Sequence, residues 1–456
     1  MRKEHYHLIG IGGIGMSAIA KLLMRKGIKV SGSDIKENTI IQQLKEKGAQ
    51  TNIGHSANNI KGADLIIYSS AIKQDNPELK EAQRLKIPLI RRAEALAKLM
   101  QDKTVITVTG SHGKTTTSCL ASCLLFNAGF RPTIAVGGLL QNLDTNACLG
   151  EGDFFIAEAD ESDGSFLCYH PEYSIITNID FEHLDYYSTF ENMTASFAKF
   201  IDQTDRKGCI FAYKSDYNLM RLLKGYKYKY ITFGLKTDAD IYPKNINLKF
   251  PNSEFDCFYK NKYVAGFSLG LAGEHNILNS LSVIALGLEL GINTTKIAQT
   301  LEGYKGTLRR MQIKFNKKKY MVIDDYAHHP TEIKATLSAI KNLEAGRMIV
   351  VFQAHRYSRT KLLIDEFGKC FDLADYIIIT DIYPAGELPI KGIDAELIFN
   401  RLKENYPDKK IVLLPRGKIV AHTLENIRQR DIVVTIGAGD IGKTCDELVQ
   451  ELKRKN

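Results

Sequence analysis

The chain has 456 residues, which corresponds to roughly three domains at a typical size of about 150 residues each. Hydrophobic residues make up 44% of it and charged residues 25%, as in ordinary globular proteins, so neither a disordered nor a fibrous chain is indicated. The formal net charge of +9 is spread along the chain without a basic tail. We therefore expect no nucleic-acid partner, although a basic balance suits polyanionic small substrates such as nucleotides.

Hydropathy and cysteine usage indicate which cellular compartment the protein occupies. No apolar run approaches the ~20 residues needed to span a bilayer, and glycines interrupt the first apolar stretch, unlike the core of a signal peptide. A cytoplasmic protein with no membrane partner is predicted. The eight cysteines include no C-x-x-C pair, which argues against a zinc site or a disulfide framework, and we expect Cys119 and Cys123 to be buried on one helix face.

The predicted elements fall into three successive α/β alternations. The first spans residues 5–100, the second begins near Thr104, and the third begins near Met311, with helices expected from Thr331 and from Lys361. We predict an α/β fold of three domains: an N-terminal Rossmann-like domain (1–100), a central P-loop-type ATPase domain with a mostly parallel sheet (101–310) and a C-terminal Rossmann-like domain (311–456).

The first candidate site is a glycine-rich turn after the first predicted strand. It reads GIGGIG over residues 10–15, and Asp34 ends the next strand. Such glycines let the backbone approach a diphosphate at a helix N-terminus, and an acidic residue about 20 positions later can accept ribose hydroxyls. Alone, this motif predicts an NAD-dependent enzyme, and a tight turn without a ligand is the alternative. The residues that we expect to bind substrate here are Gly10, Gly12, Gly13, Gly15, Asp34, His55, Ser69 and Ser70.

The second candidate site is the segment TGSHGKTT over residues 109–116, again between a strand and a helix. In a phosphate loop, backbone N–H groups surround the phosphates, the lysine meets the terminal ones and the following hydroxyl reaches magnesium. The leading glycine of the strict motif would fall at Val108, so a shortened loop is expected. The predicted ATP-binding residues of the loop are Gly110, Ser111, His112, Gly113, Lys114, Thr115 and Thr116.

The third candidate site is acidic and follows two further strands. Residues 158–163 read EADESD at the end of the strand FFIAEAD, and residues 182–185 read EHLD after the strand YSIITNID. Hard oxygen ligands and one imidazole beside a phosphate loop favour a magnesium site, with Thr115, Glu158 and His183 as its predicted ligands. A solvated acidic loop is the alternative. It is disfavoured because Glu158 stands at the end of an apolar strand, where a carboxylate without a ligand is unexpected.

The fourth candidate site lies in the third domain. Residues 324–330 read DDYAHHP and residues 353–360 read QAHRYSRT, each directly after a predicted strand. Arginines three positions apart at a helix entrance can bind a carboxylate or a phosphate with two parallel hydrogen bonds. The adjacent histidines His328 and His329 suggest zinc, but no cysteine or third histidine stands at metal spacing nearby.

Two phosphate-binding loops imply two phosphorylated ligands. A dehydrogenase has no use for a triphosphate loop, and a simple ATPase has no use for a second diphosphate loop. An NAD-dependent oxidoreductase and a binding or motor P-loop ATPase nevertheless stay open as alternatives, because either domain alone could host many reactions.

Taken together, these motifs resemble the Mur ligases over almost the whole chain. The resemblance rests on ordered segments that include GIGGIGMSAIA, VSGSD, TVTGSHGKTTT, EADESDGSF, TNIDFEHLD, GEHNILN, TLRRMQ, DDYAHHPTEI, QAHRYSRT, IYPAGE and GAGDI. It implies a three-domain enzyme of peptidoglycan synthesis that binds a UDP-sugar, ATP and an amino acid in successive domains. The implied ligands are UDP-N-acetylmuramate, ATP, Mg²⁺ and L-alanine, joined through an acyl phosphate. A monomer or a homodimer is expected.

The resemblance also implies roles for single residues. Lys114 and Thr115 match positions that serve ATP and magnesium, and Glu158 and His183 match the remaining metal ligands. Positions at the adenine, the phosphates and the ribose are matched by His275, Asn276, Arg310 and Asp325. Positions around the incoming alanine and the acyl phosphate are matched by His328, Arg356 and Arg359. The expected catalytic residues are Lys114, His183, His328, Arg356 and Arg359.

Three positions depart from the family pattern without removing a functional group: Ser111 replaces a common threonine, Met311 an expected phenylalanine and Ala354 a usual proline. Some relatives carry a carbamylated lysine that supports a second magnesium ion, and no such lysine is identified in this sequence. A recycling ligase, which adds a preformed tripeptide to the same sugar, is a further alternative, although its first glycine loop differs from GIGGIG.

Overall fold

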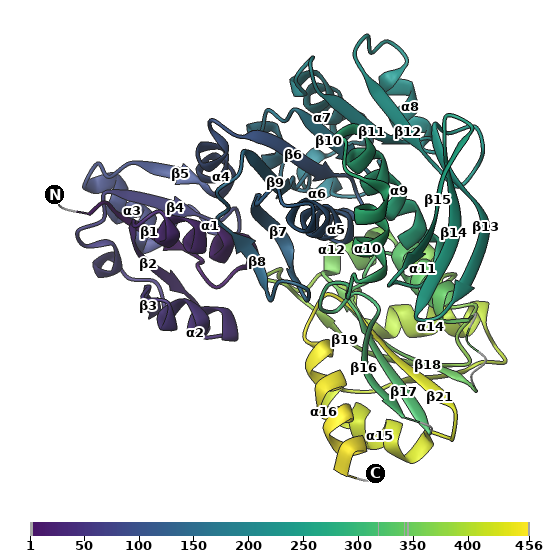
Figure 1. The fold of residues 1–456 in the computed structure, drawn as a ribbon. Coiled ribbons are helices and arrows are strands. Elements are labelled where there is room, and N and C mark those ends of the chain that lie inside the picture. Colours follow the sequence, from purple (N-terminus) through teal and green to yellow (C-terminus); the bar gives the residue numbers. More distant parts are fainter. Residues whose placement is uncertain (1–2, 318, 342, 344–345, 455–456) are drawn as a thin grey trace. The chain divides into compact units, whose positions relative to one another are not determined.

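The computed structural model describes residues 3–317, 319–341, 343 and 346–454 (Figure 1). The chain packs into two compact units. Unit 1 comprises Met1–Pro243, Cys257–Ala265 and Leu278–Leu301, and unit 2 comprises Lys244–Asp256, Gly266–Ile277 and Glu302–Asn456. Among the described residues, no helix has both the length and the apolar character required to cross a bilayer.

The N-terminal part of unit 1 is a parallel sheet in the order β3-β2-β1-β4-β5. The chain leaves β1 on one side to form β2 and later returns to its other side with β4, so β1 marks a switch point, where ligands of such sheets bind at the carboxyl ends of the strands. The elements are β1 (His5–Ile9), α1 (Ile14–Arg25), β2 (Lys29–Asp34), α2 (Thr39–Glu46), β3 (Gln50–Ile53), η1 (Ala57–Ile60), β4 (Leu65–Tyr68), α3 (Pro77–Arg84), β5 (Leu89–Arg91) and α4 (Arg92–Met100).

Side-chain alternation along these strands builds a core on both faces of the sheet. Leu8 packs in the cluster that contains the apolar face of α1, whereas its neighbour Ile9 packs in a second cluster with Leu79 of α3. Successive residues of a strand point to opposite faces, which explains why the strands read as nearly continuous apolar runs. The predicted Rossmann-like sheet is therefore present.

The central sheet has ten strands in the order β15-β14-β13-β12-β11-β10-β6-β9-β7-β8. Its middle is parallel, and β6 lies between β10 and β9, which makes a second switch point at the loop after β6. The strands are β6 (Thr104–Thr109), β7 (Thr133–Leu140), β8 (Thr145–Cys148), β9 (Phe154–Glu158), β10 (Tyr173–Ile176), β11 (Cys209–Tyr213), β12 (Tyr230–Phe233), β13 (Ile241–Lys249), β14 (Asn252–Tyr259) and β15 (Lys262–Leu269).

The helices of this part explain two of the sequence signals. Helix α5 (Lys114–Asn127) is buried along most of its length, and Cys119 and Cys123 lie in its core as expected. Helix α9 (Glu274–Glu289) ends shortly before Gly291, whose φ of +70° suits the glycine stop. The remaining helices are η2 (Ser165–Cys168), α6 (Leu184–Tyr187), α7 (Phe190–Gln203), α8 (Tyr217–Leu223) and α10 (Thr294–Glu302).

The third sheet, in unit 2, has the order β16-β17-β21-β18-β19-β20. Five of its strands are parallel, and apolar clusters cover both faces. The elements are β16 (Gln312–Lys317), β17 (Tyr320–Asp325), α11 (Pro330–Lys341), β18 (Met348–His355), α12 (Tyr357–Leu362), α13 (Ile364–Phe367), β19 (Tyr376–Tyr383), α14 (Ala395–Asn405), β20 (Lys410–Leu413), η3 (Arg416–Lys418), α15 (Ile419–Asn426), β21 (Asp431–Ile436) and α16 (Ile441–Arg454).

Strand β16 runs antiparallel to β17, so this Rossmann-like sheet is mixed. One expectation for this part of the chain is wrong. The helix expected from Lys361 begins instead at Tyr357 and ends at Leu362, and a separate short helix, α13, follows. The break falls at Leu363, which is buried in the same apolar cluster as Phe367. Leu363 has φ −115° and ψ 25°, outside the helical region, and this separates the two helices.

Candidate functional site

The first glycine loop is held by the end of the neighbouring strand. The Asp34 carboxylate accepts a hydrogen bond from the Gly12 N–H at 2.9 Å, and Asn38 Nδ2 donates to the Gly12 carbonyl at 3.1 Å. A Cβ on Gly12 would lie 2.9 Å from the Asp34 carboxylate and 3.0 Å from Ile41, so a larger residue would displace these side chains. The turn is thus built into the strand ends, and Asp34 supports it as well as facing the site.

A pocket of about 580 Å³ opens beside this loop. It is lined by Gly10, Gly13, Asp34, His55 and Ser69, which come from the ends of four parallel strands. Of the predicted substrate residues, Ser70 and Gly15 line a neighbouring pocket instead, together with Ser69 and Gly13. The structure therefore brings most of this predicted set together at one edge of the sheet.

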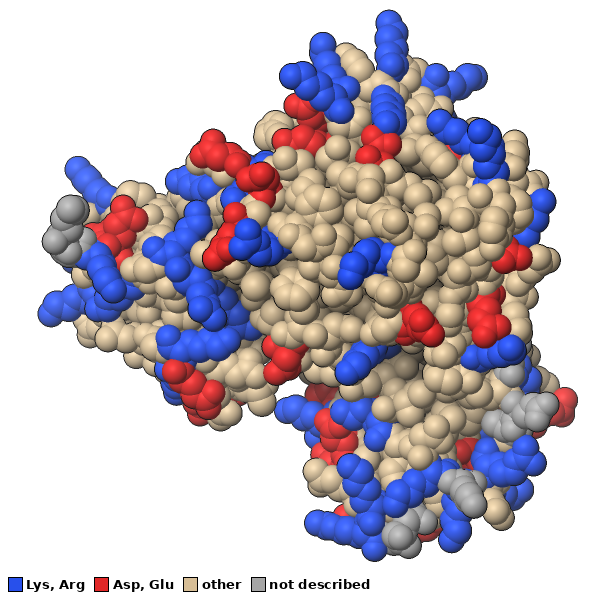
Figure 2. Space-filling view, viewed as in Figure 1, with Lys and Arg blue, Asp and Glu red and all other residues tan. Residues whose placement is uncertain are grey.

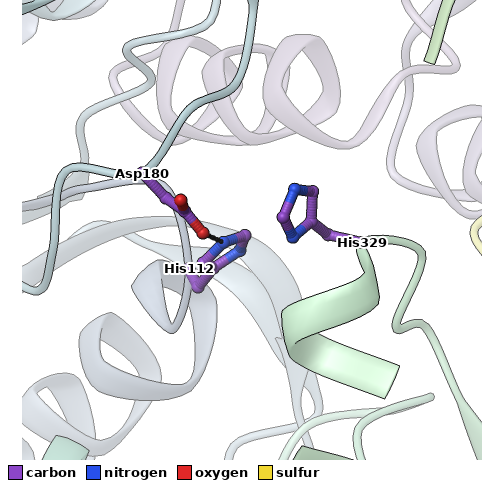
Figure 3. Close-up of side chains that lie close together, drawn as sticks. All are labelled: His112, Asp180 and His329. Carbon is purple, nitrogen blue, oxygen red and sulfur yellow. Dashed lines mark hydrogen bonds and ion pairs between the residues drawn. The ribbon is translucent and has the colours of Figure 1, made fainter. Parts of the chain in front are cut away.

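The phosphate loop between β6 and α5 is shaped by the strand β10 and its extension. Gly110 has φ +124°, and a Cβ there would lie 2.3 Å from Thr177 Oγ1. Asn178 accepts from the His112 N–H through its side chain at 2.9 Å and from the Ser111 N–H through its carbonyl at 3.1 Å. His112 also hydrogen-bonds through Nε2 to Asp180 Oδ2 at 2.9 Å (Figure 3).

Lys114, the first residue of α5, turns its ammonium group onto the loop. Nζ donates to the carbonyls of Gly110 at 2.6 Å and Ser111 at 3.1 Å, and to Glu161 Oε1 at 2.8 Å. Burial alone would lower the pKa of Lys114, but Glu161 and neighbouring carboxylates raise it above its ordinary value. The side chain of Lys114 is therefore charged, held in place by these three acceptors and largely buried.

Glu161 joins Lys114 to His183. Its side chain is fully buried, and Oε1 also lies 3.1 Å from His183 Nε2. Burial would lower the pKa of His183, whereas the hydrogen bond and charge of Glu161 raise it. Within the described residues, no hydrogen-bonding partner lies against the buried Glu161 Oε2. An unpartnered, buried carboxylate oxygen is a position where a cation fits.

The other predicted metal ligands lie at the same strand ends. Thr115 Oγ1 donates to Glu158 Oε1 at 3.1 Å, and Glu158 Oε2 accepts from the Gly137 N–H at 3.0 Å. Burial raises the pKa of Glu158, although the charge of Lys114 opposes the shift. The carboxylates of Glu158 and Glu161 and the hydroxyl of Thr115 are hard oxygen ligands of the kind that Mg²⁺ prefers, so this strand end fits that ion.

A second pocket, of about 300 Å³, is bounded by both glycine-loop and metal-site residues within unit 1. Its lining includes Gly13, Gly15 and Ser70 from the N-terminal sheet and Glu158 and Asp160 from the central sheet. A ligand in this pocket would touch the diphosphate loop of the N-terminal sheet and the acidic strand end of the central sheet at once.

Arg92 and Glu161 are residues of this region that the sequence did not single out. Arg92 begins α4, lines the 300 Å³ pocket, donates to Ser165 Oγ at 3.2 Å and lies 3.9 Å from Asp160. Its only sequence signal is the RR pair between a strand and a helix. Glu161 belongs to the acidic segment EADESD, but its spacing does not distinguish it from the other carboxylates of that segment.

In unit 2, Asp325 ends β17 and fixes the turn that follows. Its carboxylate accepts from the N–H groups of Met311 at 2.6 Å and Ala327 at 2.7 Å. Burial raises the pKa of Asp325 to about 6, while Arg310 opposes that shift. The Arg310 guanidinium lies 5.2 Å from the Tyr326 ring and 3.8 Å from Glu332.

His275 and Asn276 stand at the start of α9, in the same unit. Burial lowers the pKa of His275 to about 4, with Glu332 raising it and Arg310 lowering it further. A neutral imidazole is therefore present at pH 7. Asn276 is buried and donates through Nδ2 to the Ala272 carbonyl at 2.7 Å. The structure thus brings His275, Arg310 and Asp325 into one electrostatic neighbourhood.

The histidines and arginines of the fourth candidate site also converge. The rings of His328 and His355 lie 5.8 Å apart, and Arg359 Nη1 lies 3.3 Å from His355 Nδ1. Arg356 caps α12 with φ +71°, and its N–H donates to the Tyr383 carbonyl at 2.8 Å. Burial, together with the charges of His328, Arg359 and Arg356, lowers the pKa of His355 to about 3. His355 is a neutral acceptor that orients Arg359.

Charge on the visible surface is mixed. Figure 2 shows Lys and Arg side chains interspersed with Asp and Glu on this face. The formal net charge of +9 is thus a distributed property and not a single basic patch on this face.

Comparison with known proteins covers the chain in three consecutive blocks. The model of the Mur ligase family, catalytic domain, matches residues 5–104, the Mur ligase middle domain residues 108–287, and the Mur ligase, glutamate ligase domain, residues 309–439. Similar full-length proteins are the UDP-N-acetylmuramate–L-alanine ligases of Geotalea daltonii, 42% identical over 99% of this chain and 98% of that protein, and of Aquifex aeolicus, with the same identity and coverage.

Solved structures agree. UDP-N-acetylmuramate–alanine ligase MurC from Thermotoga maritima has a TM-score of 0.86 at 28% identity, covering 99% of this chain and 100% of that one. The murein peptide ligase of Psychrobacter arcticus shares the fold, with a TM-score of 0.73 at 22% identity, covering 98% of each chain. Because the matches extend over nearly the whole length in both sequence and fold, the chain belongs to the Mur ligase family.

Proposed function

We propose that the protein is an ATP-dependent ligase that joins L-alanine to the lactyl carboxylate of UDP-N-acetylmuramate in peptidoglycan precursor synthesis. The relatives that match this chain at 42% identity over nearly its full length are named for that reaction. The recycling ligase and the NAD-dependent oxidoreductase are not favoured, since the relatives at 42% identity are named for ligation of L-alanine, whereas the murein peptide ligase matches at 22% identity and shows the shared fold alone.

The observation that carries the proposal is the 300 Å³ pocket between the diphosphate loop and the acidic strand end. A sugar whose diphosphate binds at Gly13 and Gly15 would present its carboxylate toward the strand end at Glu158, which accepts a hydrogen bond from Thr115 at the end of the phosphate loop. That arrangement serves transfer of a phosphoryl group to the sugar carboxylate, and serves no hydride transfer. Arg92, in the lining of the same pocket, adds a positive charge that suits either anion.

The chemistry follows from the low reactivity of a carboxylate toward amines. One lactyl oxygen attacks the γ-phosphorus of ATP, ADP leaves, and an acyl phosphate forms. The amine of L-alanine then attacks the acyl carbon, loses a proton, and inorganic phosphate leaves with the bridging oxygen. In this scheme Lys114 offsets the charge on the transferred group, an effect that is commonly the largest catalytic contribution.

The remaining roles are proposed by unit. In unit 1, Thr115, Glu158 and His183 hold Mg²⁺, and Gly110, Ser111, His112, Gly113 and Thr116 surround the ATP phosphates. Bound Mg²⁺ would neutralise phosphate charge during transfer. In unit 2, His275 and Asn276 serve the adenine, Arg310 and Asp325 serve the phosphates and ribose, and His328, Arg356 and Arg359 serve the alanine carboxylate and the acyl phosphate. A cytoplasmic enzyme, monomeric or dimeric, is proposed.

The test is product identification by mass spectrometry with the full chain, ATP, Mg²⁺ and UDP-N-acetylmuramate. L-Alanine, glycine, L-serine and the tripeptide L-alanyl-γ-D-glutamyl-meso-diaminopimelate are supplied one at a time. We expect the alanyl product to form fastest, with one ADP per product. A product formed only with the tripeptide would identify a recycling ligase, and an absorbance change with NAD would identify an oxidoreductase.

A further inference from the structure

A buried carboxylate lies next to the 580 Å³ pocket without lining it. The side chain of Glu78, in the first turn of α3, is 0% exposed. Its Oε1 accepts from Asn59 Nδ2 at 2.6 Å and from the Ser56 N–H at 3.2 Å. Its Oε2 accepts from Ser33 Oγ at 2.7 Å and faces His7 Nε2 at 3.3 Å. Four donors from β1, β2 and the loop after β3 thus converge on one carboxylate.

These donors keep Glu78 ionised. Burial would raise the pKa of Glu78, but the hydrogen bonds from His7, Ser33 and Asn59 lower it to about 2. An ionised carboxylate only accepts hydrogen bonds, so the single hydroxyl proton of Ser33 is directed at Glu78. The contact between Ser33 Oγ and His55 Nδ1, at 3.1 Å, is then donated by His55.

The proton on Nδ1 determines whether His55 Nε2 is a hydrogen-bond donor or an acceptor in the pocket. A neutral imidazole has one N–H, so in the neutral ring a proton on Nδ1 leaves a lone pair on Nε2. Nδ1 also lies 3.6 Å from Glu78 Oε1, which favours the same tautomer. His55 lines the pocket beside Asp34 and Ser69. The ring therefore presents an acceptor on the side away from Ser33.

A proton count on the other side of Glu78 supports its charge. A chain of contacts joins the Gly62 carbonyl, His5, Ser31, His7 and Glu78. Both ends are acceptors, and two neutral imidazoles with one hydroxyl supply one proton fewer than the contacts require. One ring must therefore be an imidazolium. Burial lowers the pKa of His5, and the His7 ring lies 3.3 Å from the Glu78 carboxylate.

We propose that Glu78 is a positioning residue for the nucleoside end of the UDP-sugar. It acts through Ser33 and His55, whose Nε2 accepts a hydrogen bond from a ribose hydroxyl or the uracil N–H. Ionised diphosphate offers no such donor, and UDP without its sugar is the ligand that tests the nucleoside as the donor. This inference rests on the function proposed above and adds a residue that orients the nucleoside contact.

Glu78→Gln separates positioning from folding. The amide N–H₂ cannot face Asn59 and Ser56, which are donors, so it faces His7 and Ser33. His7 can accept as a neutral ring, and every contact back to Gly62 is then satisfied without the extra proton. Ser33 must accept from the amide and donate to His55 Nδ1. The variant should therefore fold, while His55 shifts its proton to Nε2 and presents a donor to the pocket.

The experiment measures UDP binding to the full chain by calorimetry and the His55 tautomer by ¹⁵N NMR. Glu78→Gln should weaken UDP binding roughly three- to tenfold, the effect of one hydrogen bond. Its ring signals should report a proton moved from Nδ1 to Nε2. In a His55→Ala background, Glu78→Gln should cause no further loss. Glu81→Gln, a surface carboxylate on the same helix that pairs with Arg84, is the matched control and should bind UDP as the wild type does.

Each contrary outcome has a distinct meaning. Equal UDP affinity of wild type and Glu78→Gln, in folded proteins of equal melting temperature, would overturn the inference alone. An equal loss with and without His55 would overturn the route through His55. Failure of the wild-type chain to bind UDP would overturn the proposed function of the pocket, and the inference with it.

Discussion

The ammonium group of Lys114 is held by two carbonyls of its own loop and by the buried Glu161. Lys114→Ala should lower ligation by at least about 100-fold, because charge on the transferred phosphoryl group is no longer offset. The variant should also melt a few degrees lower, since Glu161 keeps only His183 as a charged partner. Phosphate release and thermal unfolding measure the two effects, and near-wild-type turnover would rule out the assigned ATP site.

Arg359 is oriented by the neutral His355, which accepts from its guanidinium. Arg359→Lys keeps the charge but loses the planar fork, so it should raise the KM for L-alanine by roughly 10- to 150-fold if Arg359 binds the alanine carboxylate. The KM values for ATP and the sugar nucleotide should move little. Lys361→Arg, an exposed cation on the same helix, is the matched control. An alanine KM unchanged in both Arg356 and Arg359 variants would direct attention to His328.

His355 should make the free energy of unfolding depend on pH. Its pKa in the folded chain is lowered to about 3, below the ordinary value of 6.5, so its contribution to stability is present above pH 6.5 and is lost as the pH falls toward 3. Between pH 8 and pH 5, the wild type should lose about 1–2 kcal/mol more stability than His355→Gln. Urea unfolding followed by circular dichroism measures the difference; parallel pH dependences would contradict the assigned burial.

At the scale of elements, the turn between β21 and α16 repeats the glycine pattern of the first loop and holds an arginine side chain. The segment GAGDIG over residues 437–442 resembles a diphosphate loop, yet Arg309 donates to the carbonyls of Gly437 at 2.7 Å and Gly439 at 3.0 Å. Arg309 Nε also donates to the buried Asp324 at 2.8 Å. The turn thus binds the guanidinium of Arg309. Its glycines let the backbone carbonyls come close to that side chain, which contributes to packing within unit 2.

Arg309→Ala should therefore destabilise unit 2 by about 3 kcal/mol, because it leaves Asp324 buried with reduced compensation. Lys443→Ala, an exposed substitution on α16, should change stability by less than about 0.5 kcal/mol. Urea unfolding of both variants provides the comparison. Equal stability of the two would mean that Arg309 does not hold the turn.

The sequence predicted those parts of the fold that depend on local pattern. Apolar runs, glycine turns and helix periodicity located most strands of the parallel sheets and both phosphate-type loops. It did not predict strand β16, whose direction depends on pairing with β17, or the helix break at Leu363, which depends on tertiary burial. Glu161, Arg92 and Glu78 were missed for the same reason, because their roles come from neighbours distant in sequence.

At the scale of the whole molecule, each of the three sheets presents its candidate residues at the carboxyl ends of its parallel strands. Asp34 and His55 do so in the first sheet, Glu158 in the second and Asp325 in the third. This is the edge at which open α/β sheets bind ligands. The domain boundaries near residues 100 and 310 stay predictions, since the packing divides the chain into two units and not three.

The measurement that tests the central claim most directly follows oxygen through the reaction. UDP-N-acetylmuramate labelled with ¹⁸O in both lactyl carboxylate oxygens is converted with ATP, Mg²⁺ and L-alanine. If an acyl phosphate forms, one label must appear in the released phosphate and one must stay in the amide carbonyl. Unlabelled phosphate, or phosphate released at the same rate without the sugar nucleotide, would contradict the account.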